Sequence, residues 1–163
     1  LRAKPLFGGQ INGAIELNEA RTASFVKLLL AEEPDVVFTH WPIDSHLDHQ
    51  VASILVFRAH VASRGRFHLY FFEVNSGSQT MGFKPTDYVD VTSVREKKKA
   101  ALFAHKSQDG EEIYRKHHEP MEIWRGREAG VGAAEAFVRL ARDGRESTLP
   151  GFLRPGPPGR EVK

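Results

Sequence analysis

A three-residue apolar run, Val36-Val37-Phe38, lies between two segments whose apolar residues recur at helical spacing. These segments extend from Glu19 to just before Pro34 and from Asp48 to about Ser63. A short apolar run in this position is typical of a buried parallel strand, because helices join parallel strands and cover both faces of their sheet. This arrangement constrains the fold more than any other feature: the chain must build a sheet with helices packed on it.

The pattern continues along the chain. Asn18 suits the N-cap of the first helix. Further strands are predicted over Phe67–Val74 and Tyr88–Val91, and further helices from Ser93 to about Ser107, after Gly110 to Trp124, and over about Val131–Arg142. Helices alternating with strands predict an α/β fold with a mostly parallel sheet. Ligands of such sheets bind outside the carboxyl ends of strands, and the segment after Phe38 occupies that place.

Composition narrows the class of protein. The 163 residues suit one domain, which we expect over residues 1–150, followed by a disordered Gly- and Pro-rich tail over residues 151–163. The formal net charge is only +2 and both signs are scattered, so we expect no nucleic-acid surface. The sequence contains no cysteine, so any metal must use His, Asp or Glu side chains or water. No apolar run is long enough for a membrane helix.

The candidate chemistry lies in the ten residues His40–His49, which contain three histidines and two aspartates. His46 and His49 stand at positions i and i+3 at a helix start, so their imidazoles project to nearly the same side. One ring can then bind a metal while the other faces a substrate. The alternative is that these side chains only cap the helix and hold the turn by hydrogen bonds, and the spacing leaves both interpretations open.

The run PDVVFTHWPIDSHLDHQ resembles the second motif of the LmbE/PIG-L zinc-dependent N-deacetylases. The resemblance spans about Phe7 to Leu153, in four further blocks that keep the family's order: residues 88–92, 98–108, 125–131 and 134–137. It implies a Rossmann-like, mostly parallel sheet flanked by helices. The implied reaction is removal of an acetyl group from an N-acetylglucosaminyl-type conjugate, with Zn2+ as the cofactor and a cytoplasmic location.

The resemblance also implies roles for individual residues. His49 becomes the zinc ligand and His46 the catalytic histidine near the oxyanion, while Leu47 replaces the usual proline. Asp48 either orients an imidazole from the second shell or caps the helix. Asp44, Trp41 and His105 are candidate substrate-binding residues. For these three we leave open an Asp44 that bonds to His46 or forms a turn, a Trp41 that packs in the core or rim, and a His105 that completes packing or binds a helix end.

The family's first motif, A-H-P-D-D, does not occur in this sequence. That motif supplies two zinc ligands and the general base, so we expect an N-terminally truncated family member that is inactive alone, because one imidazole holds zinc weakly. Two alternatives remain. The chain is a non-catalytic domain that associates with another chain or forms a homo-oligomer, or it is a metal-dependent hydrolase of a different amide or ester.

Overall fold

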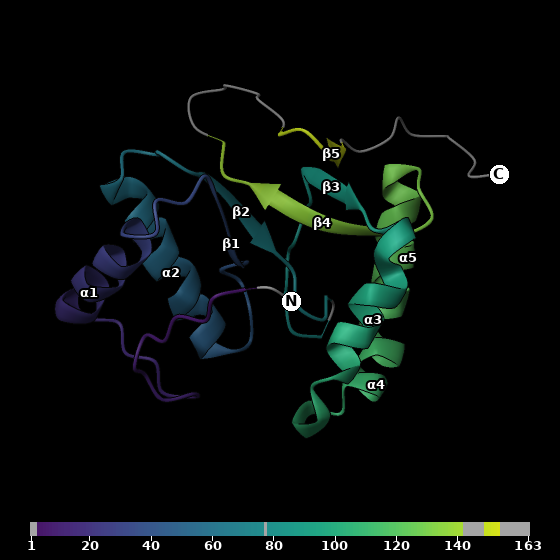
Figure 1. Cartoon of the computed structure of the whole chain (residues 1–163), viewed down its shortest axis with the longest axis horizontal. Helices are drawn as coiled ribbons and strands as arrows, with labels where there is room; N and C mark the ends of the chain where they lie inside the picture. Colours follow the sequence, from purple (N-terminus) through teal and green to yellow (C-terminus); the bar gives the residue numbers. More distant parts are fainter. Residues whose placement is uncertain (1–2, 77, 142–148, 154–163) are drawn as a thin grey trace. The chain divides into compact units, whose positions relative to one another are not determined.

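The computed structural model describes residues 3–76, 78–141 and 149–153 (Figure 1). The fold is a mixed α/β arrangement whose five-stranded sheet has the strand order β1-β2-β4-β3-β5 and is flanked by helices. The chain divides into two compact units. Of the described residues, the N-terminal unit comprises 3–76, 78–83 and 138–140, and the C-terminal unit comprises 84–137, 141 and 149–153.

The N-terminal unit contains four elements in an alternating order: α1 Glu19–Leu30, β1 Val36–His40, α2 Leu47–Ala62 and β2 His68–Phe72. Each lies where the sequence pattern predicted an element of that type. The two strands pair in parallel, from Val36 opposite His68 to His40 opposite Phe72. The helix that connects them explains this direction, because a parallel pair needs a crossover connection.

Asn18 is the N-cap of α1, as predicted, and its side chain accepts the backbone N–H of Arg21 at 2.9 Å. Helix α2 packs against β1 and β2, and α1 packs on α2 (Figure 1). The core of the unit is a cluster of side chains from α2, from β2 and from the residue just before β2: Val56, Ala59, Phe67, Leu69 and Phe71. This packing fixes where β1 ends and where α2 begins, and the histidine-rich segment lies between those two points.

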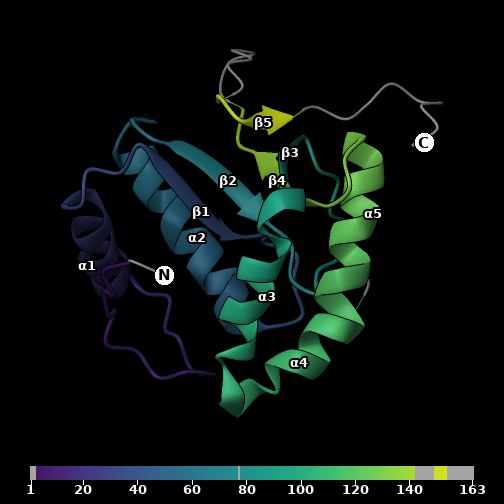
Figure 2. The same cartoon turned by 45° about the vertical axis from the view of Figure 1, so that its right-hand side comes forward.

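The C-terminal unit contains two helical segments and the remaining strands (Figure 2). Its elements are β3 Asp87–Asp90, η1 Thr92–Val94, α3 Arg95–Phe103, η2 Lys106–Gln108, α4 Gly110–Ile113, the π-helical turn η3 Tyr114–His118, α5 Glu119–Ala129, β5 Phe152–Leu153 and the first four residues of β4 Ala134–Arg139. The helix predicted after Gly110 is therefore confirmed. The helix predicted from Ser93 begins instead at Arg95, after a 3-10 turn.

The prediction of a mostly parallel sheet was wrong. Strand β3 pairs antiparallel with β4 and with β5, and β1 with β2 is a parallel pair. Part of the error arises because residues 131–142, predicted as a helix, contain β4. Pairing with β3 overrides the helix propensity of Ala134-Glu135-Ala136.

The tail predicted to be disordered from residue 151 contains a short strand at its start, because Phe152–Leu153 pairs with β3. Residues 154–163, the rest of that tail, lie outside the described residues. In the part of the chain that the structure describes, no helix is both long and apolar enough to cross a membrane.

Candidate functional site

The histidine-rich segment connects the carboxyl end of β1 to the first turn of α2, within the N-terminal unit. A second loop of the same unit, after β2, runs antiparallel beside it through an isolated bridge between Asp44 and Thr80. Backbone hydrogen bonds flank the bridge, from Ser45 N to Gln79 O at 3.0 Å and from Met81 N to Ile43 O at 3.0 Å. Residues far apart in the sequence therefore surround the histidines.

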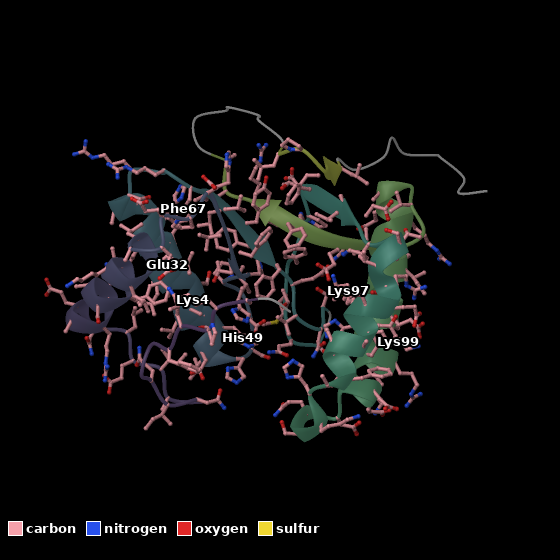
Figure 3. The ribbon with its side chains drawn as sticks, in the orientation of Figure 1. Lys4, Glu32, His49, Phe67, Lys97 and Lys99 are labelled. Carbon is pink, nitrogen blue, oxygen red and sulfur yellow. The ribbon has the colours of Figure 1, made fainter. Side chains whose placement is uncertain are left out.

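Three imidazole rings stack in this segment. The ring centroids of His40 and His49 are 4.0 Å apart with planes 14° apart, and those of His46 and His49 are 4.6 Å apart with planes 19° apart. Figure 3 labels His49 near the start of α2. The structure thus brings His46 and His49 together, as their spacing predicted. Ring nitrogens bind ligands in the ring plane, so stacked rings do not converge on one ion.

Asp44 is the polar centre of the segment and is only 3% exposed. Its Oδ1 accepts the backbone N–H of His46 at 2.8 Å, and its Oδ2 accepts the Thr80 hydroxyl at 3.0 Å. Burial alone would raise the pKa of Asp44, but these two hydrogen bonds and the nearby His49 hold the pKa below its usual value. Asp44 is therefore an internal anion with several donors around it.

His49 faces two polar groups through Nδ1. Asp44 Oδ1 lies 3.2 Å away and Gln79 Nε2 lies 3.1 Å away. With Nδ1 occupied in this way, Nε2 is the nitrogen that a ligand would reach. A carboxylate on one imidazole nitrogen and a metal on the other is the usual arrangement at protein metal sites.

This arrangement fits one ligand of a zinc site. Among residues 3–76, 78–141 and 149–153, no group of three or more His, Asp or Glu side chains is arranged to hold a metal ion. Catalytic zinc sites use three protein ligands. The described residues therefore fit a part of such a site and not the whole donor set.

His46 is the N-cap of α2, because its Nδ1 accepts the backbone N–H of Asp48 at 3.2 Å. An accepting Nδ1 leaves the ring proton on Nε2. The alternative that Asp48 caps the helix was therefore wrong. Asp48 instead accepts the backbone N–H groups of Gly13 at 2.5 Å and Ile15 at 3.2 Å. These bonds lower the pKa of Asp48, and the bond from Gly13 has the largest effect.

His40, at the end of β1, stacks on the other face of His49. Burial, and then the neighbouring His49, lower the pKa of His40 to about 4, although Asp44 opposes the shift. This ring is therefore neutral near pH 7. A neutral aromatic neighbour supports the orientation of His49 without adding charge.

The other candidate residues have different surroundings. Trp41 packs edge-on against Phe71 and Phe83, with centroid distances of 5.9 and 5.6 Å, and its indole N–H donates to Met81 O at 3.0 Å. These contacts place Trp41 against the core cluster. His105 is exposed and belongs to the C-terminal unit, between α3 and η2.

Sequence reasoning missed the partners that hold this segment. Thr80 and Gln79 approach Asp44 and His49 from a loop 36 and 30 residues away in the chain. The length of the loop after Val74 suggested that it borders a site, but no local signal singles out these two residues. Their pairing depends on the Asp44–Thr80 bridge, which is a tertiary contact.

Comparisons with known proteins bear on the fold. No protein-family model and no curated protein matches the sequence. Solved structures do match. The conserved protein TT1542 from Thermus thermophilus superposes with a TM-score of 0.67 at 25% identity, over 79% of this chain and 62% of that one.

Two enzymes share the fold. The 4-carboxy-2-hydroxymuconate hydratase GalB from Pseudomonas putida has a TM-score of 0.64 at 19% identity, covering 82% of this chain and 63% of its own. The N,N'-diacetylchitobiose deacetylase from Pyrococcus horikoshii has a TM-score of 0.56 at 24% identity, covering 73% of this chain and 50% of its own. This chain therefore spans less than two thirds of the length of each.

Proposed function

We propose that this chain is part of a zinc-dependent N-deacetylase of the LmbE/PIG-L type. The observation that carries the proposal is the His49–Asp44 contact of 3.2 Å beside the stacked ring of His46, at the start of α2. One imidazole is backed by a carboxylate, as a metal ligand usually is. The fold shared with a deacetylase supports the same assignment.

In this proposal His49 would hold zinc through Nε2, and His46 would offer its Nε2–H to the carbonyl oxygen of the substrate. Bound zinc supplies Lewis acidity, which polarises an amide carbonyl and makes water a better nucleophile at neutral pH. His46 is suited to its role because its Nδ1 is already used by the Asp48 N–H. A donor aimed at the oxygen that gains charge stabilises the transition state.

The proposal needs two further zinc ligands and a general base beyond the described residues. We assign them to an A-H-P-D-D motif of the kind that precedes this segment in the family. The substrate that follows from this assignment is an N-acetylglucosaminyl-type conjugate, and the products are acetate and a free amine. Asp44 uses both carboxylate oxygens internally, and the indole N–H of Trp41 donates to Met81 O, so the ring face of Trp41 is the part of these two residues that we propose for contact with the sugar.

The test compares this chain, alone and joined to any coding sequence that precedes it in its gene, for zinc content and acetate release. His49→Ala should remove most of the zinc and the acetate release. His46→Ala should retain the zinc and lose the acetate release. His68→Ala is the matched control, because His68 is exposed at the start of β2 and should change neither. Unchanged zinc and acetate release in His49→Ala would refute the assignment.

The hydratase with the same fold favours a second candidate, because one fold hosts different chemistries. The substrate panel should therefore contain other N-acyl amides, simple esters and 4-carboxy-2-hydroxymuconate beside the acetylated sugars. Turnover of the last compound without acetate release from any sugar would replace the deacetylase assignment with a hydratase.

A further inference from the structure

We propose that Asp44 is the positioning residue of this site: its carboxylate holds His49 in the tautomer with the proton on Nδ1 and the lone pair on Nε2. The inference rests on the proposed function, because Nε2 of His49 is the atom assigned to zinc. The sequence offered Asp44 as a residue that bonds to His46, binds a substrate hydroxyl or forms a turn, and not as a partner of His49.

Two groups compete for Nδ1 of His49. Asp44 Oδ1 lies 3.2 Å from it and Gln79 Nε2 lies 3.1 Å from it. If Nδ1 carries a proton, it donates to the carboxylate. If Nδ1 carries a lone pair, it accepts from the Gln79 amide, and the carboxylate oxygen then faces that lone pair. Hydrogen bonds to ionised groups are roughly twice as strong as those between neutral groups. The tautomer of His49 with the proton on Nδ1 is therefore favoured.

Asp44 is itself held in place by three segments. It is 3% exposed, its Oδ1 accepts the His46 N–H at 2.8 Å, and its Oδ2 accepts the Thr80 hydroxyl at 3.0 Å. Its backbone carbonyl accepts the side-chain amide of Gln50 from α2 at 2.6 Å. The carboxylate has little freedom to rotate, so the orientation of the His49 ring follows from it.

The same oxygen atom links both histidines. Asp44 Oδ1 fixes the backbone of His46, the N-cap residue, and contacts the ring of His49. A single side chain therefore sets the distance between the two rings, whose centroids are 4.6 Å apart. A carboxylate behind a ligating imidazole also raises the basicity of that ligand.

The first experiment measures the His49 tautomer in the metal-free chain at neutral pH, by long-range proton–nitrogen correlation of 15N-labelled histidines. The wild-type ring should carry its proton on Nδ1. Asp44→Asn should move the proton toward Nε2, because the neutral amide oxygen that replaces the carboxylate oxygen is a weaker acceptor and the Gln79 amide can then donate to a bare Nδ1. Gln79→Leu should leave the proton on Nδ1.

Asp48→Asn is the matched control. It makes the same chemical change in another buried aspartate, whose carboxylate bonds to the backbone of Gly13 and Ile15. The His49 tautomer should not change in it. A wild-type ring with its proton on Nε2, or an Asp44→Asn ring unchanged from wild type, would overturn the inference. The wild-type measurement decides the question even if Asp44→Asn does not fold.

The second experiment titrates Zn2+ into wild type and Asp44→Asn, each joined to any coding sequence that precedes this segment in its gene. Loss of a partner behind a ligating histidine typically weakens metal binding about 10–100-fold, and we expect a decrease of that size. Equal affinity in two folded proteins that both bind Zn2+ would contradict the positioning role. Absence of zinc binding in both would count against the proposed function and leave the tautomer result in force. The two failures are therefore distinguishable.

Discussion

The carboxylate of Asp48 accepts the backbone N–H of Gly13 at 2.5 Å, across 35 residues of sequence. It also accepts the N–H of Ile15 at 3.2 Å. These bonds attach the segment before α1 to the first turn of α2. Because the acceptor is ionised, each bond is of the stronger, charge-assisted kind.

Asp48→Ala should release this segment. The amides of Gly13 and Ile15 lose their acceptor, so their hydrogen exchange should accelerate about tenfold, as expected for a lost hydrogen bond to a charged group. Exchange measured by mass spectrometry or NMR tests this. The control is Asn18→Ala, which removes the acceptor of the Arg21 N–H and should accelerate exchange at the start of α1 instead. Equal protection of Gly13 in wild type and Asp48→Ala would contradict the expectation.

The C-terminal unit contains a buried carboxylate, Glu122, with 1% of its surface exposed. Arg95 Nε donates to it at 2.7 Å, Tyr114 OH donates at 2.9 Å, and Lys98 Nζ lies 3.2 Å away. Glu122→Gln removes the charge that offsets the two cations. We expect the free energy of unfolding to fall by about 3 kcal/mol, the scale found when one partner of a buried ion pair is removed.

Urea denaturation measures this change. The matched control is Glu112→Gln, because Glu112 pairs with Arg115 and Lys116 at the exposed surface of the same unit. Exposed pairs contribute little, so the control should keep the wild-type midpoint. A Glu122→Gln midpoint as high as that of the control would show that the buried ion pairs of Glu122 contribute nothing to the free energy of unfolding.

Gly126 in α5 lies against the segment that leads into β4. A Cβ at this position would approach the Cα of Ala133 and the carbonyl oxygen of Val131, each to 2.8 Å. Both neighbours are backbone atoms and cannot turn aside. Gly126→Ala should therefore destabilise the protein by about 1–3 kcal/mol, the usual cost of overpacking.

Thermal or urea denaturation tests the Gly126 prediction against Gly8→Ala. A Cβ on Gly8 meets no heavy atom within 4 Å. The control should be as stable as wild type. If Gly126→Ala matched it, the close approach of α5 to the segment before β4 would be refuted.

His118, in the π-helical turn, has a lowered pKa, first because of burial and then because of the Lys98 charge. Glu135 and Glu122 oppose the shift, and His117 adds to it. The folded state therefore binds the His118 proton less readily than the unfolded state does. By linkage, stability is complete above the unfolded pKa of about 6.5 and decreases as the pH falls through the folded pKa.

His118→Gln should remove that part of the decrease. The measurement is the denaturation midpoint at several pH values between about 7 and about 5, for wild type and variant, with His68→Ala as an exposed-histidine control. The wild-type curve should drop more steeply than that of His118→Gln over this interval. Parallel curves would contradict the assigned direction.

The N-terminal unit was predictable because its signals are local. Asn18 caps α1, and Val36-Val37-Phe38 forms a strand between two helices with apolar faces. The segment after Val131 gave the opposite signal. Ala134, Glu135 and Ala136 favour a helix in isolation, yet they pair with β3. Helix propensity spans less than about 1 kcal/mol per ordinary residue, so tertiary pairing reverses it.

The candidate site shows the same division. The i, i+3 spacing of His46 and His49 predicted that their rings lie together, since both residues stand at the start of α2. The roles of Asp44 and Asp48 depend on distant chain segments, the loop of Gln79 and Thr80 and the loop of Gly13. No periodicity encodes such contacts. Local sequence identified the imidazoles but not the groups that orient them.

The nearly parallel rings of His40, His49 and His46 affect how firmly the site can retain a metal ion. Their lone pairs point sideways in separate planes, so the stack offers monodentate donors and no chelate. An ion taken up by His49 alone would therefore gain no chelate effect. Durable metal retention in any preparation of this protein would then report ligands that approach from outside the stack.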